Sequence, residues 1–227
     1  MKTVGTEKRT IFIGDVHGCI DELKEMIHTL RPVESDRVIL LGDLINRGPD
    51  PAAVVQFVYE SKFECLMGNH EHEYLHYFQT VDKYKNLRRS IGEELHEWIS
   101  NRPLYIEDKD FMAVHAGLVP GEHPSRSKKE ILLNIRTWDA DTKNIKNPEN
   151  PPWYSFYKDK KPVFYGHWAR EGLNVRKNTI GLDSGCVYGR GLSAYILESH
   201  EIVQINSRKV HYIPPSLREQ KKTNLIT

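Results

Sequence analysis

Residues 10–18 read TIFIGDVHG, a short run of apolar and β-branched residues that ends at a glycine, an aspartate and a histidine. Such a run predicts a buried β-strand over Thr10 to Ile13. Asp15 and His17 then follow on the loop at its carboxyl end, which is where α/β sheets collect their ligands. This stretch therefore predicts a strand of the core and, beside it, the edge at which a functional site forms.

The same pattern recurs along the chain. Four more apolar runs deliver polar residues at their ends: 37–41 before Gly42-Asp43, 63–67 before Gly68-Asn69-His70, 111–114 before His115-Ala116-Gly117, and 162–165 before Gly166-His167. Apolar spacing from Ile20 to Leu30 predicts a helix that Pro32 ends, and Asp50-Pro51 begins a second helix through about Tyr59. Repeated strand–loop–helix units favour an α/β protein with parallel strands.

Other segments give weaker patterns. Ser-x-x-Glu at Ser90 and at Ser127 resembles a capping box, so we expect a helix start near each serine. Residues 140–152 are rich in Asn, Lys, Asp and Pro and predict an exposed loop, and residues 179–210 predict several strands. We expect the segment from about Pro120 to Pro152 to lie over the site and to influence specificity.

The composition is that of an ordinary globular protein of 227 residues, 39% hydrophobic and 28% charged. It predicts a single domain over residues 1–215, followed by a polar tail at 216–227. A net charge of +1 gives no support to general nucleic-acid binding or to membrane attraction. No stretch reaches membrane-spanning length and no signal peptide is evident, so the expected location is the cytoplasm.

The three cysteines, Cys19, Cys65 and Cys186, are far apart in the sequence and form no CxxC pair. They predict neither a disulfide framework nor a zinc ribbon. We expect all three to be reduced and mostly packed.

The polar residues after the strands include two carboxylates, three imidazoles and one amide, in the order Asp15, His17, Asp43, Asn69, His115 and His167. These ligands suit hard or borderline divalent cations such as Mn, Fe, Co, Ni, Zn or Mg. Six ligands exceed what one cation with an open position needs, so two ions sharing a carboxylate are expected. Such a pair would lower the pKa of a bridging water, neutralise phosphate oxygens and orient an in-line attack.

The motifs resemble those of the phosphoprotein phosphatase family of calcineurin-like metallophosphoesterases, over roughly residues 10–198. The matching runs occur in order: Gly14-Asp15-Val16-His17-Gly18, Gly42-Asp43 with Arg47-Gly48, Gly68-Asn69-His70-Glu71, His115-Ala116-Gly117 and Gly166-His167. Within the family, Tyr165-Gly166-His167-Trp168 and Gly181-Leu182-Asp183-Ser184-Gly185-Cys186 look most like the diadenosine tetraphosphatase branch. The resemblance implies two mixed β-sheets packed as a sandwich, flanked by helices, with a dinuclear metal site at one edge.

The resemblance also implies roles for the residues. Asp15, His17 and Asp43 would hold one metal, with Asp43 bridging, and Asn69, His115 and His167 would complete the second site. His70 would be the general acid, and Arg47 would bind phosphate oxygens. Arg136 lies where relatives carry a second phosphate-binding arginine. The two metals are expected to be manganese in the first instance.

Asn46 departs from the family pattern, since the protein phosphatases carry aspartate there, paired with the catalytic histidine. An aspartate would raise the imidazole pKa, whereas Asn46 can accept a hydrogen bond from His70 but supplies no charge. Weaker acid catalysis matters least for a leaving group that departs readily as an anion. We therefore expect metal-bound hydroxide to attack phosphoanhydrides, above all dinucleoside polyphosphates such as diadenosine tetraphosphate.

Other functions remain open at this point. The runner-up is a serine/threonine or tyrosine protein phosphatase acting on phosphorylated protein. His72-Glu73-Tyr74-Leu75-His76 matches the zinc-protease pattern H-E-x-x-H, although one short motif explains less than five ordered ones. A phosphate-binding module without turnover is the third alternative. An aromatic cluster including Trp153 and Trp168 could stack on a base, although aromatic residues more often fill cores.

Overall fold

The computed structural model describes residues 8–214, in which two five-stranded sheets form the centre of the molecule. The predicted tail at 216–227 lies outside these residues. The first sheet has the order β10-β9-β1-β2-β3, formed by Thr10–Ile13 (β1), Arg37–Leu40 (β2), Glu64–Cys65 (β3), Gly191–Ile196 (β9) and Glu201–Asn206 (β10). The second has the order β4-β5-β6-β8-β7, formed by Tyr105–Glu107 (β4), Met112–Val114 (β5), Val163–Tyr165 (β6), Asn174–Val175 (β7) and Thr179–Gly181 (β8).

Both sheets are mixed, as the resemblance implied. In the first, β1, β2 and β3 are parallel, while β9 and β10 run antiparallel to their neighbours. In the second, β5, β6 and β8 are parallel, and β4 and β7 are antiparallel edge strands. The five strands predicted to deliver ligands are all among the parallel ones, so within each sheet their carboxyl ends lie at the same edge.

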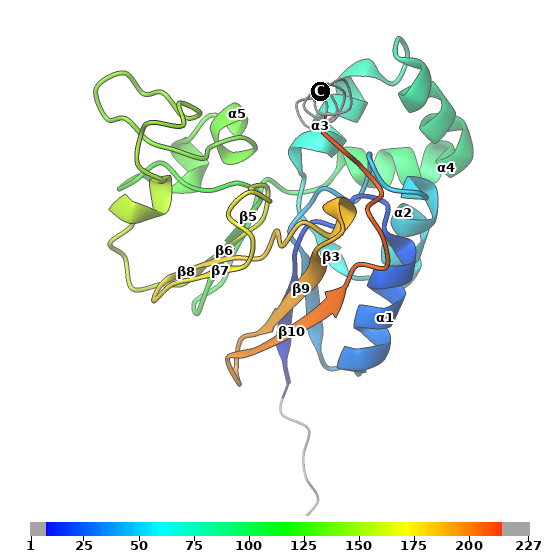
Figure 1. Cartoon of the computed structure of the whole chain (residues 1–227), viewed down its shortest axis with the longest axis horizontal. Coiled ribbons are helices and arrows are strands. Elements are labelled where there is room, and N and C mark those ends of the chain that lie inside the picture. Colours follow the sequence, from blue (N-terminus) through cyan, green and yellow to red (C-terminus); the bar gives the residue numbers. More distant parts are fainter. Residues whose placement is uncertain (1–7, 215–227) are drawn as a thin grey trace, which may run out of the picture.

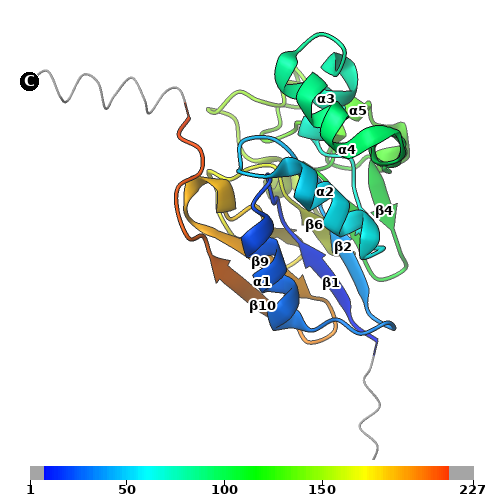
Figure 2. The ribbon, with the colours of Figure 1, turned by 90° about the vertical axis from the view of Figure 1, so that its right-hand side faces the viewer.

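The helices are α1 (Ile20–Leu30), α2 (Pro51–Glu60), α3 (Asn69–Tyr77), α4 (Asp82–Ser100) and the short α5 (Lys129–Leu132), with 3-10 turns η1 (Pro124–Arg126), η2 (Trp153–Phe156) and η3 (Cys186–Tyr188). Helices α1 and α2 pack on the outer face of the first sheet, and α4 packs against α2 and α3 (Figures 1 and 2). The outer face of the second sheet is covered by α5, η2 and loops (Figure 1). No helix within residues 8–214 has the length and apolar character needed to cross a bilayer.

Successive side chains of the central strands point to opposite faces of the sheet, so that one set packs on the helices and the other packs on the second sheet. Ile11 and Ile13 face the helices, whereas Phe12 faces the second sheet. The Phe12 ring stacks on Phe164 of β6 with centroids 3.7 Å apart and meets Phe111 edge-on at 4.9 Å. Aromatic contacts of this kind add to the area they bury, so the two sheets are fixed against each other close to the edge that carries the ligands.

The starts of α1 and α2 were predicted correctly, whereas neither Ser90 nor Ser127 caps a helix as its motif suggested. Helix α1 begins at Ile20, and the Asp50 side chain caps α2 by accepting from the Ala53 N–H at 2.9 Å. Ser90 lies inside α4, and its hydroxyl donates to the Asn86 carbonyl at 3.1 Å. The break in α4 falls at Gly92, whose φ of 75° suits a residue without a side chain.

The second capping box was also wrong, because Ser127 donates to the Glu122 carboxylate at 2.7 Å instead of capping a helix. Helix α5 starts two residues later, after Lys128, and has no side-chain cap. In both places the serine hydroxyl donates its hydrogen bond to a group other than the helix terminus, and the local sequence pattern does not encode that choice.

Candidate active site

The residues after the parallel strands meet at one edge of the sandwich, as predicted. Asp15 follows β1, Asp43 follows β2 and Asn69 opens α3, while His115 and His167 follow β5 and β6 of the other sheet. The side chains of Asp15, His17, Asp43 and His115 are almost fully buried. The two sheets therefore contribute ligands to a single cluster.

Asp43 lies at the centre of this cluster. Its carboxylate is 3.6 Å from Nε2 of His17 and 3.5 Å from Nε2 of His115. Two groups of potential metal ligands share it: one with His17 and His70, the other with His115 and His167, the ligand atoms of each lying within 4.8 Å of one another. A carboxylate common to both groups is the arrangement needed to bridge two cations.

The imidazoles are oriented by the backbone. Nδ1 of His17 donates to the Ile45 carbonyl at 3.0 Å, and Nδ1 of His115 donates to the Leu41 carbonyl at 2.8 Å. In a neutral ring this leaves Nε2 with a lone pair facing the cluster. Nε2 of His115 lies 3.0 Å from the Asn69 side-chain oxygen, a contact between two lone pairs that a cation between them would make favourable. The donors therefore fit divalent metal.

His167 gives the same indication from the second sheet. Its backbone N–H donates to both Asp15 oxygens, at 3.1 and 3.0 Å, and its Nδ1 lies 2.8 Å from the Asn69 side-chain oxygen. Its Nε2 is buried and has no hydrogen-bond partner among the described residues. Buried polar atoms are rarely left unpaired in proteins, so this nitrogen fits the role of a metal ligand.

The electrostatics of the cluster point the same way. Burial, with Asp183 and Asp43 nearby, raises the pKa of Asp15 well above its usual value, and burial raises the pKa of Asp43 to about 7. Burial together with the charge of Arg47 lowers the pKa of His17 to about 3. Carboxylates crowded in this way repel one another, and neutral imidazoles do not offset their charge. Two divalent cations would offset the negative charge of these carboxylates.

Glu71 supports the cluster from below and was not predicted, although it lies within one of the quoted motifs. Its carboxylate accepts the backbone N–H groups of Asp43 and Leu44 at 2.8 and 2.9 Å and that of Gly68 at 3.0 Å. Asp43 itself has a left-handed backbone with φ of 51°. The Ile45 N–H donates a fourth bond at 3.2 Å. Four contacts from one carboxylate hold this strained loop in place, since such a conformation persists only where its surroundings enforce it.

His70 and Asn46 are in contact, as the resemblance implied. Nδ2 of Asn46 lies 2.7 Å from Nδ1 of His70 and 2.9 Å from the Tyr84 hydroxyl. The amide thus donates to His70, whereas the sequence argument had it accepting. Nε2 of His70 lies 3.9 Å from Asp43, on the side of the cluster. Burial and the neighbouring His17 lower the pKa of His70, so its imidazole is neutral.

A cavity of about 1470 Å³ opens above this cluster. Arg47 lies on its wall with Nη1 2.9 Å from Nε2 of His17, and its guanidinium lies over the rings of Tyr188 and Tyr212 at 5.6 and 5.7 Å. Arg136 also lines the cavity, and its Nε is buried without a hydrogen-bond partner in the described part of the chain. Both predicted arginines therefore face the space in which a phosphate would bind.

Comparison with known proteins agrees with this geometry. The family model for the calcineurin-like phosphoesterases matches residues 8–210. The chain belongs to that family. It is 29% identical to the asymmetrical bis(5'-nucleosyl)-tetraphosphatase PrpE of Oceanobacillus iheyensis, over 87% of this chain and 92% of that protein. It is 27% identical to the symmetrical bis(5'-nucleosyl)-tetraphosphatase of Nitrosospira multiformis, over 85% of this chain and 94% of that protein.

Solved structures show the same fold. A provisionally named diadenosine tetraphosphatase superposes with a TM-score of 0.82 and 29% identity, over 89% of this chain and 95% of that one. A cold-active protein-tyrosine phosphatase from Shewanella superposes with a TM-score of 0.59 at 18% identity, which shows a shared fold alone. The predicted family and fold class are confirmed.

The cavity of this phosphoesterase contains residues that the sequence did not single out. Besides Arg47, Arg136 and Trp168, which the sequence analysis named, its lining includes the cationic side chains of Lys146, Arg170 and Arg190 and the aromatic side chains of Tyr188 and Tyr212. Arg136 and Lys146 come from the predicted segment 120–152, so that segment does border the site. The remaining cations come from turns with no recognisable pattern of their own. Of the aromatic cluster, Trp153 is core, with 0% exposure.

The protease motif of this phosphoesterase lies on α3, away from any metal-binding geometry. His76 is exposed and its ring contacts Tyr77. Glu73 lies 4.0 Å from Lys83. No cluster of potential metal ligands within residues 8–214 includes His72 or His76. The pattern H-E-x-x-H occurs here by chance, and the protease alternative is set aside.

Proposed function

We propose that this phosphoesterase hydrolyses the phosphoanhydride bonds of dinucleoside polyphosphates, with diadenosine tetraphosphate as the representative substrate. The observation that carries the proposal is the composition of the cavity. Five Arg or Lys side chains and three aromatic side chains line it above the Asp/His cluster. A polyphosphate chain needs several cations along its length, and a base needs a flat partner. The names of the relatives support the same substrate class.

The metal requirement follows from the donors already described. We propose two divalent cations, manganese in the first instance, held by Asp15, His17 and Asp43 on one side and by Asn69, His115 and His167 on the other, with Asp43 shared. When bound, such a pair neutralises phosphate oxygens and makes water a competent nucleophile.

The remaining roles belong to side chains that line the cavity. Arg47 and Arg136 would bind non-bridging phosphate oxygens, because a guanidinium can donate two parallel hydrogen bonds to an oxyanion. Neutral His70 would hold a proton on Nε2, since Nδ1 accepts from Asn46. A neutral imidazole is a weak acid, which suits a nucleotide leaving as a phosphate anion better than an alkoxide.

The test is product analysis. Metal-stripped protein reloaded with manganese is incubated in parallel with diadenosine tetraphosphate, a phosphoserine peptide, a phosphotyrosine peptide and an aryl phosphate. We expect rapid release of nucleotides and little dephosphorylation of either peptide. ADP alone would assign symmetrical cleavage, and ATP with AMP would assign asymmetrical cleavage. Rapid turnover of either peptide with the dinucleotide intact would overturn the proposal in favour of a protein phosphatase. Binding of nucleotide without turnover would indicate a recognition module.

A further inference from the structure

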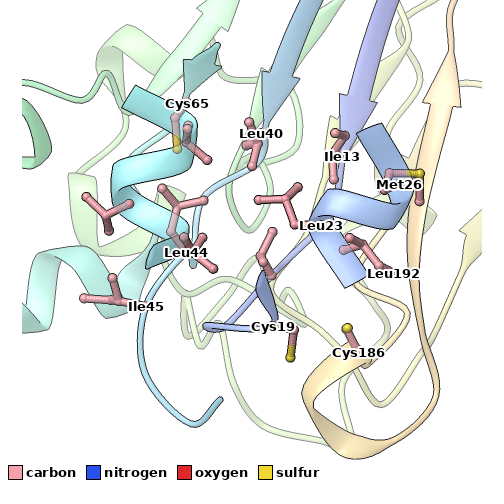
Figure 3. Close-up of a cluster of buried hydrophobic side chains, with 14 of the residues drawn as sticks. Ile13, Cys19, Leu23, Met26, Leu40, Leu44, Ile45, Cys65, Cys186 and Leu192 are labelled. Atoms are coloured by element: carbon pink, nitrogen blue, oxygen red, sulfur yellow. The ribbon is translucent and has the colours of Figure 1, made fainter. Parts of the chain in front are cut away.

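A second group of potential metal ligands lies on the α1 side of the first sheet, outside the phosphoesterase cluster. Cys19 is the residue before α1, Glu22 is in its first turn, and Cys186 belongs to η3. The two sulfurs and a Glu22 oxygen lie within 4.8 Å of one another. All three residues are almost fully buried, and both cysteines form part of the core beside Leu23 (Figure 3).

His211 extends this group from the C-terminal segment. Its Nε2 lies 3.5 Å from Oε1 of Glu22, and 8% of its side chain is exposed. Nε2 is buried and makes no hydrogen bond to any residue in the range 8–214. Nitrogen and oxygen ligands of one tetrahedral zinc ion, each about 2.1 Å from the metal, would be about 3.4 Å apart. The observed 3.5 Å matches that separation and also brings His211 within ion-pair distance of Glu22.

The protein holds Glu22 rigidly in this position. Its carboxylate accepts the Arg208 backbone N–H at 3.1 Å and a longer contact of 3.4 Å from the Ser207 hydroxyl. Cys19 and Glu22 are three residues apart at the start of a helix, so their side chains share one face. The positive end of the α1 dipole also favours negatively charged ligands there. A buried carboxylate is costly unless it is paired, and these contacts leave one side of it for a cation.

Simple packing does not account for this combination. Two thiols can fill a core by themselves, but they need neither a buried carboxylate nor an imidazole beside them. Two sulfurs, one nitrogen and one oxygen form the mixed ligand set that suits tetrahedral zinc.

We propose that Cys19, Glu22, Cys186 and His211 bind one zinc ion, separate from the catalytic cations. On binding, the two thiols lose their protons to solvent, and the ion stays in the +2 state. The ion joins α1, η3 and the C-terminal segment. Tyr188 of η3 and Tyr212, next to His211, are the rings that lie beneath Arg47. The zinc site would therefore fix the part of the cavity wall that positions a phosphate-binding arginine.

The test uses cobalt(II) as a probe, because only thiolate ligands give an intense sulfur-to-cobalt charge-transfer band in the near ultraviolet. The catalytic cluster contains only nitrogen and oxygen donors, so it contributes no such band. Full-length protein is stripped of metal under reducing conditions and titrated with cobalt(II). We expect the band to saturate at one equivalent of thiolate-bound cobalt per chain and to vanish when zinc is added.

Three variants make the assignment specific. Cys186→Ser abolishes the band, while Cys65→Ser, which removes the buried cysteine outside the cluster, leaves it intact. His211→Ala, at the surface side of the site and so compatible with folding, weakens cobalt binding by more than ~10-fold. A wild-type protein without the band, whose three thiols all react after denaturation, overturns the proposal. So does isolation of the protein with Cys19 and Cys186 joined as a disulfide.

Discussion

His70 lies in an environment that disfavours its charged form. Burial, His17 and Arg47 all lower its pKa, and the adjacent amide of Asn46 supplies no compensating charge. The Tyr84 hydroxyl, 2.9 Å from the same amide, fixes the side chain of Asn46 against the ring. This residue-scale arrangement explains how a member of a phosphatase family can prefer anhydrides, whose leaving groups require little protonation.

Replacing Asn46 with aspartate tests this explanation. A carboxylate beside Nδ1 raises the imidazole pKa and favours the proton-donating form. We expect Asn46→Asp to raise kcat/KM on an aryl phosphate by about tenfold and to change little on diadenosine tetraphosphate. The measurement is kcat/KM on each substrate, determined by steady-state kinetics across pH 5–9. No gain on the aryl phosphate would show that the neutral imidazole does not set substrate preference.

Arg136 provides a second residue-scale prediction, because its buried Nε lacks a partner among residues 8–214. A hydrogen bond to a charged group contributes about 1.5–3 kcal/mol. Arg136→Ala should therefore lower kcat/KM on diadenosine tetraphosphate by about 10- to 150-fold, mainly through KM. Arg89→Ala, an exposed residue of α4, is the matched control and should behave as wild type. Equal kinetic constants for the two variants would show that Arg136 does not bind the phosphate of the substrate.

At the scale of elements, the turn between β3 and α3 positions the cluster. A Cβ on Gly68 would lie 2.3 Å from both the backbone nitrogen and a carboxylate oxygen of Asp43. The backbone there is otherwise ordinary, with φ of −92°. Glycine is needed at this position for space, since any side chain would displace the shared ligand.

Gly68→Ala should accordingly lower kcat/KM by at least ~100-fold, because a shift of about 1 Å at a catalytic centre has that effect. It should also weaken manganese binding. Gly92→Ala is the comparison: no atom of residues 8–214 lies within 4 Å of the new methyl group, but φ is positive. That variant should lose about 1 kcal/mol of stability, as seen by denaturant unfolding, with unchanged kinetics. Full activity in Gly68→Ala would contradict the role of this turn.

The elements also show what sequence alone can predict. Strand ends and the polar residues that follow them were predictable, because apolar runs mark buried strands and parallel strands place their ends together. The partners of Ser90 and Ser127 were not, since each depends on a residue brought near by the fold. Glu71 and the cations Arg170 and Arg190 were missed for the same reason: their importance lies in what they face across the cavity or beneath the loop, which no local pattern records.

At the scale of the whole molecule, the buried charges make metal-free stability depend on pH. Burial raises the pKa of Asp43 and of Glu71 to about 7, so each binds its proton more tightly in the folded chain. The protonated carboxyls therefore stabilise the folded state fully when the pH is below their pKa in the unfolded chain. This stabilisation is lost as the pH rises through about 7. The buried histidines, typified by His17, have lowered pKa values and lose stability as the pH falls below about 6.5.

Below pH 6.5 the buried carboxyls and the buried histidines change the stability in opposite directions as the pH changes. Above pH 6.5 only the carboxyls still contribute a pH dependence. We expect the Tm of the metal-free protein to fall by a few degrees between pH 6.5 and 8. With manganese present the trend should disappear or reverse, because ionised carboxylates are then stabilised by the cations. Thermal unfolding in chelator and in manganese tests both statements. A Tm that stays level or rises with pH in chelator would contradict the electrostatic account.

The central claim, that a two-cation cluster shared between the sheets cleaves phosphoanhydrides, is tested most directly by a manganese titration of activity. Metal-free protein receives increasing manganese, and bound metal is measured beside diadenosine tetraphosphate turnover. We predict no turnover without metal and a plateau at two manganese ions per chain, with Asp43→Asn abolishing both. Turnover by the metal-free protein, or full turnover at one ion per chain, would contradict the account.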